Sequence, residues 1–157
     1  MTDARTVPRR LLVIDDDACY RHVVGWLLRK CGHTVAEAES GFAGLALLRQ
    51  QPVDLVMTDL RMPGLTGWDV ARIAKAMHPH LPVVLVTGDA GVIPLDQPER
   101  RYVDALLAKP CGQAEFQAVI GPLTRNLADT VGSRDPASGE LTTVRGWQTS
   151  PTGPGTL

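Results

Sequence analysis

The chain has 157 residues, 44% of them hydrophobic, and a formal net charge of −1 at pH 7, which suits one core-bearing domain with a tail. The near-neutral charge and scattered basic residues argue against direct binding to nucleic acid, and no apolar run approaches the roughly 20 residues of a membrane-spanning helix. Three cysteines without CxxC spacing predict reduced thiols in a cytoplasmic protein, and neither a zinc site nor a disulfide framework.

Hydrophobic periodicity predicts strands and helices that alternate along the chain. Five short apolar or alternating runs have the length and composition of strands. They cover residues 10–14, 34–38, 53–58, 82–87 and 105–108. Apolar positions at helical spacing predict amphipathic helices after four of these strands. The helices run from Ala18 to Cys31, from Ser40 to before Pro52, up to Met77, and across residues 116–127.

Two segments depart from this regular pattern. Between the fourth and fifth strands, Pro94 and Pro98 leave no room for a long helix, so we predict at most a short helix near residues 98–103. Residues 129–157 are rich in Gly, Pro, Ser and Thr, a composition that predicts a flexible tail. The alternative is that residues 141–147 dock as a short segment on the domain or on a partner.

Strands that alternate with helices over short connections predict an α/β fold, in which helices cover both faces of a parallel sheet. We expect a flavodoxin-like, doubly wound sheet of five strands in the order 2-1-3-4-5, with an irregular fourth helix. In that order the first and third strands are neighbours. The carboxyl ends of four strands then bring five polar residues to one crevice. These residues are Asp15, Asp16, Asp59, Thr87 and Lys109.

The crevice residues predict phosphoryl chemistry at Asp59. An isolated Asp after a strand most often caps a turn, but three neighbouring carboxylates raise one another's proton affinity, and one Lys cannot neutralise them. The missing positive charge suggests Mg²⁺, which prefers oxygen ligands and a substrate phosphate. Lys109 and the Thr87 hydroxyl are suited to hold phosphoryl oxygens, which makes Asp59 the candidate nucleophile.

Four motifs occur in a characteristic order along the chain. They are VIDDD at residues 13–17, DLVMTDLRMPGLTG at 54–67, VLVTG at 84–88 and AKP at 108–110. With these motifs the sequence resembles the receiver domain of two-component response regulators over about Arg10–Leu127. We therefore expect a lead-in at residues 1–9, a receiver domain at 10–128 and the tail beyond it. No output domain follows, which predicts a stand-alone receiver.

The resemblance implies a role for each crevice residue. Asp59 would accept a phosphoryl group from a sensor histidine kinase or a histidine phosphotransfer protein, as part of a phosphorelay. Thr87 would hydrogen-bond the bound phosphoryl group and Lys109 would pair with it, and the Lys109–Pro110 peptide bond would be cis. The implied magnesium ligands are Asp16, Asp59, the backbone carbonyl of Arg61 and, through water, Asp15.

The sequence also departs from the family at its switch. In the family, the switch consists of the threonine and an aromatic residue three positions before the lysine. In this sequence Thr87 is present, but the second position is Leu106. Ring rotation therefore cannot report phosphorylation at that position. We expect the output to be an interaction with a downstream protein, and we expect no enzymatic activity beyond self-catalysed phosphorylation and dephosphorylation.

Two other functions stay open from the sequence. A degenerate receiver that acts as a phosphorylation-independent scaffold is favoured only by Leu106 and the broken fourth helix. A phosphatase with an aspartate nucleophile, of the haloacid dehalogenase type, is suggested by the DxD spacing of Asp15 and Asp17. In that reading Cys19 replaces the expected Thr or Val, and Asp59 with its loop has no role.

Overall fold

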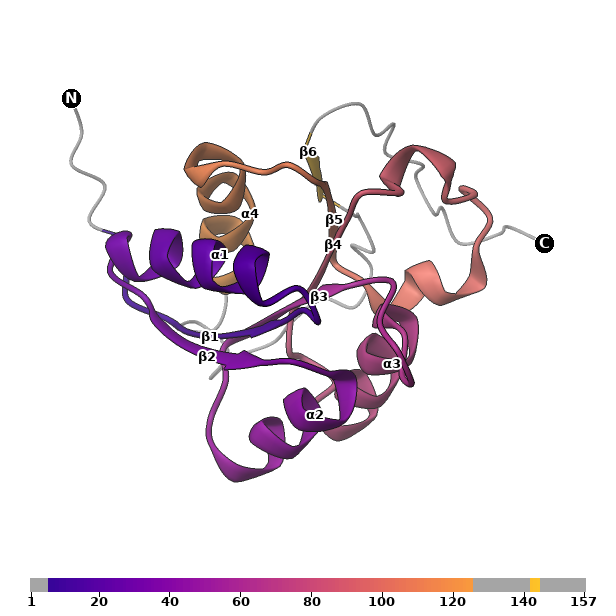
Figure 1. Ribbon diagram of the computed structural model, residues 1–157, viewed down its shortest axis with the longest axis horizontal. Helices are drawn as coiled ribbons and strands as arrows, with labels where there is room; N and C mark the ends of the chain where they lie inside the picture. Colours follow the sequence, from indigo (N-terminus) through magenta and orange to yellow (C-terminus); the bar gives the residue numbers. More distant parts are fainter. Residues whose placement is uncertain (1–5, 126–141, 145–157) are drawn as a thin grey trace.

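The computed structural model describes residues 6–125 and 142–144, which form one parallel sheet with helices on both faces (Figure 1). The strands follow the order β2-β1-β3-β4-β5-β6. They are β1 (Arg10–Ile14), β2 (Thr34–Ala38), β3 (Leu55–Asp59), β4 (Val83–Thr87), β5 (Ala105–Ala108) and β6 (Thr142–Val144). The helices are α1 (Ala18–Lys30), α2 (Gly41–Gln50), α3 (Gly67–Met77) and α4 (Gln113–Arg125).

The predicted order 2-1-3-4-5 is confirmed for β1 to β5, and the structure adds a sixth strand. β6 pairs with β5 in parallel register, with Leu106 opposite Thr143. It falls within the segment expected to be a flexible tail, and its position agrees with the alternative that residues 141–147 dock on the domain. The other residues of the predicted tail lie outside the described part of the chain.

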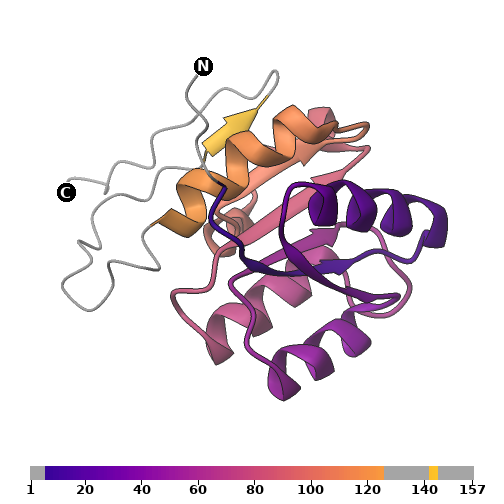
Figure 2. The same ribbon diagram turned by 90° about the vertical axis from the view of Figure 1, so that its left-hand side faces the viewer.

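Helices cover the two faces of the sheet in pairs. α1 and α4 lie on one face and α2 and α3 on the other (Figure 1), and the turned view shows the strands between these helix layers (Figure 2). Successive strand residues point to opposite faces, so Leu12 and Ile14 of β1 join the core under α2 and α3, whereas Leu11 and Val13 join the core under α1 and α4. Burial on both faces explains why the central strands are apolar throughout.

Side-chain caps fix the starts of three helices beside the sheet. The Asp17 carboxylate accepts from the backbone N of Tyr20 at the start of α1, and Ser40 caps α2 in the same way. At α3, the Thr66 and Asp69 side chains each accept from the other's backbone N–H, which forms a capping box. These bonds satisfy backbone donors that have no partner within the helix.

The segment between β4 and β5 is irregular, as predicted. It contains two short 3₁₀ helices, η1 (Ala90–Val92) and η2 (Pro98–Tyr102), in place of a regular helix. Proline lacks the N–H that a helix interior requires, and η2 accommodates Pro98 at its first position. None of the helices in the described part of the chain is long and apolar enough to cross a membrane.

An ion pair between Arg10 and Asp54 joins the starts of β1 and β3. The Asp54 carboxylate accepts from the Arg10 backbone N at 2.7 Å and from Nη2 at 2.9 Å. Burial by itself raises the pKa of Asp54, but the hydrogen bonds and charge of Arg10 outweigh burial and lower it. The carboxylate form of Asp54 is therefore favoured by folding.

This pair predicts a pH-dependent contribution to stability. Because the pKa of Asp54 is lower in the folded state than in the unfolded state, its contribution is complete above about pH 4 and is lost as the pH falls through the folded pKa. We expect Asp54→Asn to lower the free energy of unfolding by about 1 kcal/mol at neutral pH. Urea denaturation from neutral to acidic pH should show that the difference between wild type and Asp54→Asn becomes smaller. Asp96→Asn, which replaces an exposed acid in a loop, should have the same free energy of unfolding as wild type at each pH.

Candidate functional site

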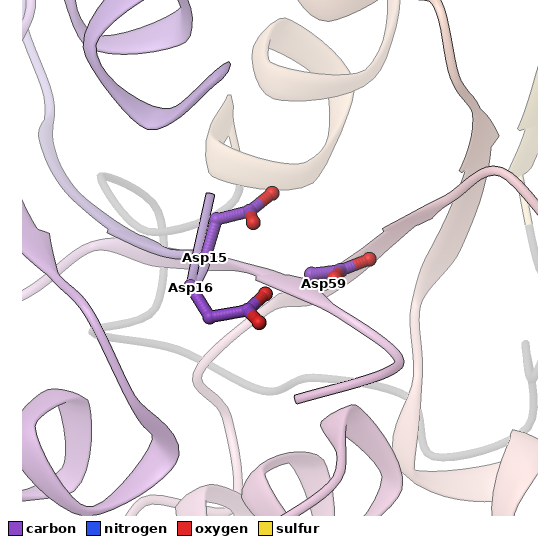
Figure 3. A group of neighbouring side chains, drawn as sticks. All are labelled: Asp15, Asp16 and Asp59. Carbon is purple, nitrogen blue, oxygen red and sulfur yellow. The ribbon is translucent and has the colours of Figure 1, made fainter. Parts of the chain in front are cut away.

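Three aspartates meet where β1 and β3 end. The two strands pair with Ile14 opposite Thr58, so the residues that follow these two reach the same edge of the sheet. Carboxylate oxygens of Asp15, Asp16 and Asp59 all lie within 4.8 Å of one another, and Figure 3 shows them gathered at this edge. Asp59 is the last residue of β3, one residue later than the strand end that the sequence predicts.

Lys109 links this cluster to the end of β5. Its Nζ lies 2.8 Å from Asp15 Oδ2 and 3.4 Å from Asp59 Oδ1. Asp15 is buried, and its other oxygen accepts from the backbone N of Asp17 at 2.9 Å. Burial by itself lowers the pKa of Lys109, but the hydrogen bond and charge of Asp15, joined by Asp59, raise it, so the ammonium stays charged.

The surroundings of Asp59 disfavour its charged form, whereas those of Lys109 favour the charged ammonium. Burial raises the pKa of its carboxyl group, and the neighbouring Asp15 carboxylate raises it further, while Lys109 opposes both. Asp16 is exposed and lies on the solvent side of the cluster. One lysine thus faces three carboxylates, and the cluster retains an excess of negative charge. Such a set of hard oxygen ligands, partly open to water, fits Mg²⁺.

Thr87 reaches the same edge from β4. Its side-chain oxygen accepts from the backbone N of Asp89 at 3.1 Å, and its carbonyl accepts from the backbone N of Lys109 at 2.9 Å. The hydroxyl proton remains available for a further acceptor. The Lys109–Pro110 bond is cis, as the resemblance implies. Leu106 is buried in the core under α2 and α3.

Arg61 follows Asp59 in the loop after β3. Its exposed side chain pairs with Asp89, with 2.6 Å between Arg61 Nε and Asp89 Oδ2. The pair joins the loops after β3 and β4. The backbone carbonyl of Arg61 stays a predicted metal ligand.

Tyr20 is a site residue that the sequence analysis did not identify. Its ring lies beneath Lys109, with Nζ 4.1 Å from the ring centroid. In the sequence it is one more apolar position of α1. Its position could have indicated a role in the site, because it lies on the first turn of the helix that begins directly after Asp15, Asp16 and Asp17. Burial, with the nearby Cys111 thiol and the carboxylates of Asp15 and Asp59, raises the pKa of the Tyr20 phenol and keeps it neutral.

The fold and this acidic edge define a class of signalling domain, and comparison with known proteins identifies the family. The response regulator receiver domain family matches residues 11–121. The chain therefore belongs to the receiver domains of two-component systems. Receiver domains are phosphoacceptor signalling domains that bind Mg²⁺ at an acidic pocket.

Relatives of this chain include proteins of similar and of greater length. It is 35% identical to the chemotaxis protein CheY of Pseudomonas aeruginosa over 104 residues, which cover 64% of this chain and 84% of that protein. It is 32% identical to the transcriptional regulatory protein GlrR of Escherichia coli over 124 residues, which cover 78% of this chain. The match covers only 28% of GlrR, so the activity of that whole protein does not transfer.

Solved structures give the same fold. A response regulator receiver domain protein from Clostridium thermocellum superposes with a TM-score of 0.71 at 27% identity, over 76% of this chain and 97% of that one. The response regulator TrrA from Thermotoga maritima, solved in complex with Mg²⁺-BeF, superposes with a TM-score of 0.68 at 24% identity, over 73% of this chain and 98% of that one.

Proposed function

We propose that this receiver domain accepts a phosphoryl group on Asp59 from the phosphohistidine of a kinase or phosphotransfer protein, and that it then acts through a protein partner in the cytoplasm. An Asp59 carboxylate oxygen attacks phosphorus, the P–N bond to the imidazole breaks, and the released nitrogen takes up a proton. The observation that carries the proposal is the convergence of three aspartates with Lys109 at one sheet edge.

The residues around Asp59 have separate tasks in this transfer. Lys109, already within 3.4 Å of Asp59, pairs with a phosphoryl oxygen and offsets charge that the transfer brings into the site. The Thr87 hydroxyl donates to a second phosphoryl oxygen. Asp16, Asp59 and the Arg61 carbonyl would hold Mg²⁺, and Asp15 would assist through water. The ion, when bound, neutralises charge on the phosphoryl oxygens.

The two competing functions have less support. A phosphatase of the haloacid dehalogenase type would use Asp17 together with Asp15, but the Asp17 carboxylate caps α1 and does not belong to the acid cluster. A scaffold would not need Lys109 to contact both Asp15 and Asp59. The irregular segment between β4 and β5 affects the surface that a partner could bind. None of the proposed site residues lies in this segment.

Labelling with a small phosphodonor tests the proposal directly. The protein is incubated with phosphoramidate, with and without Mg²⁺, and intact-mass spectrometry counts the added phosphoryl groups. We expect one group per chain, only with Mg²⁺, and mapped to Asp59 after borohydride reduction of the acyl phosphate. Labelling that does not depend on Mg²⁺, or that maps to another residue, would contradict the proposal.

A further inference from the structure

The ammonium group of Lys109 is enclosed by two carboxylates and one aromatic ring. Asp15 and Asp59 approach it at 2.8 and 3.4 Å, and the Tyr20 ring centroid lies 4.1 Å away. Only 21% of the Lys109 side chain is exposed. A cation at this distance from an aromatic face is attracted by the ring quadrupole, and more strongly where water is largely excluded. The ring therefore helps to determine where the ammonium lies.

Tyr20 is itself firmly held. It lies on the first turn of α1, and its backbone N donates to Asp17 Oδ1 at 3.1 Å in the bond that caps the helix. Its ring is half-buried and packs against the core under α1 and α4. A tyrosine ring has few rotatable bonds, in contrast to the four-carbon stem of a lysine. Tyr20 thus gives the flexible Lys109 side chain a rigid surface to rest on.

We propose that Tyr20 is a positioning residue, whose ring face holds the Lys109 ammonium toward Asp59 for phosphoryl transfer. This inference rests on the proposed function. Lys109 must leave part of its contact with Asp15 to pair with a phosphoryl group on Asp59. With the ring beneath it, the ammonium needs only a short movement between the two carboxylates. Without the ring, the Lys109 stem can adopt other rotamers and water can reach the ammonium. A smaller fraction of molecules then has the ammonium beside Asp59 when the phosphoryl group arrives.

The proposal assigns the effect to the ring face and not to the phenol oxygen. Tyr20→Phe keeps the aromatic face and removes the hydroxyl, so it serves as the matched control. Tyr20→Leu keeps an apolar side chain in the core but removes the quadrupole. Lys109 also pairs with Asp15 and Asp59, which would hold Mg²⁺, and an ammonium that is held less firmly repels Mg²⁺ no more than before. Neither variant should therefore weaken the binding of Mg²⁺ alone.

The experiment compares the full chain with both variants. Initial rates of phosphoramidate labelling at saturating Mg²⁺ should fall about fivefold in Tyr20→Leu and stay within about twofold of wild type in Tyr20→Phe. Calorimetric titration with Mg²⁺ should show no loss of affinity in either variant. In proton NMR, the Lys109 Hε resonances should be shifted upfield by the ring in wild type and in Tyr20→Phe, and this shift should disappear in Tyr20→Leu.

Each contrary result has a distinct meaning. Wild-type rates in Tyr20→Leu would overturn the positioning role, and equal losses in both variants would assign the effect to the hydroxyl and overturn the role of the ring face. A parallel loss of Mg²⁺ affinity would show general damage to the acid cluster, which also overturns it. If wild type itself is not labelled, the proposed function fails, while the Lys109 resonances still decide whether the ring holds the lysine.

Discussion

Replacing Asp59 with Asn is expected to reduce phosphoramidate labelling to background while leaving the protein folded. The amide has the size of the carboxylate but lacks the anionic oxygen that attacks phosphorus. Asp59 is one of three carboxylates within 4.8 Å of one another, and both burial and Asp15 raise its pKa. Its ionised form is therefore disfavoured by folding. Without Mg²⁺ at neutral pH, Asp59→Asn should raise the free energy of unfolding by about 0.5 kcal/mol, after solvent screening is allowed for.

Asp17→Asn is the matched control for this variant. Asp17 follows the cluster in sequence, but its carboxylate caps α1, and asparagine is an equally good N-cap. Labelling of Asp17→Asn should equal that of wild type. Intact-mass spectrometry measures labelling, and urea denaturation followed by circular dichroism measures stability. Residual labelling of Asp59→Asn at the wild-type level would show that another residue is the acceptor.

Replacing Gly67 with Ala is expected to cost about 3 kcal/mol of folding free energy and to slow phosphorylation at least about tenfold. Gly67 is the first residue of α3 and lies directly beside Asp59, the proposed acceptor. A Cβ atom here would lie 2.4 Å from the Asp59 carbonyl oxygen and 2.9 Å from Leu60 Cα. Both are backbone atoms, so no side-chain rotation relieves the contact. The start of α3 or the end of β3 must move, and movement of β3 displaces Asp59.

Gly91→Ala separates this effect from the general cost of replacing glycine. A Cβ atom at Gly91 meets nothing within 4 Å, so its free energy of unfolding should stay within about 0.5 kcal/mol of wild type. Urea denaturation gives the stabilities, and phosphoramidate labelling gives the rates. If Gly67→Ala is as stable and as quickly labelled as wild type, α3 does not set the position of Asp59 as closely as the distances indicate.

The strand order and the residues at the strand ends could be predicted because they depend on local patterns. Apolar runs that stop at Asp15, Asp59, Thr87 and Lys109 locate the strand ends, and the rules for parallel sheets place those ends along one edge. β6 could not be predicted with the same certainty. Thr142–Val144 has no distinct periodicity, and its strand state depends on the edge of β5 that folding makes available.

The contacts of individual side chains could not be predicted from the sequence, because they depend on the tertiary structure. Nothing in the sequence pairs Arg61 with Asp89, because the two residues meet only when the loops after β3 and β4 lie side by side. The ring of Tyr20 likewise reaches Lys109 only because α1 and the end of β5 approach the same site. Rotamers are chosen by neighbours that are distant in the chain, and a periodic pattern carries no information about them.

By itself, the sequence determined the class of fold and the set of residues that meet at the acidic edge, since hydrophobic period and strand ends are local properties. The tertiary structure decided how these residues are arranged. Lys109 bridges the buried Asp15 and the proposed acceptor Asp59, and its ammonium lies over the Tyr20 ring. Sheet register and helix packing fix those distances, because they bring together parts of the chain that are far apart in sequence.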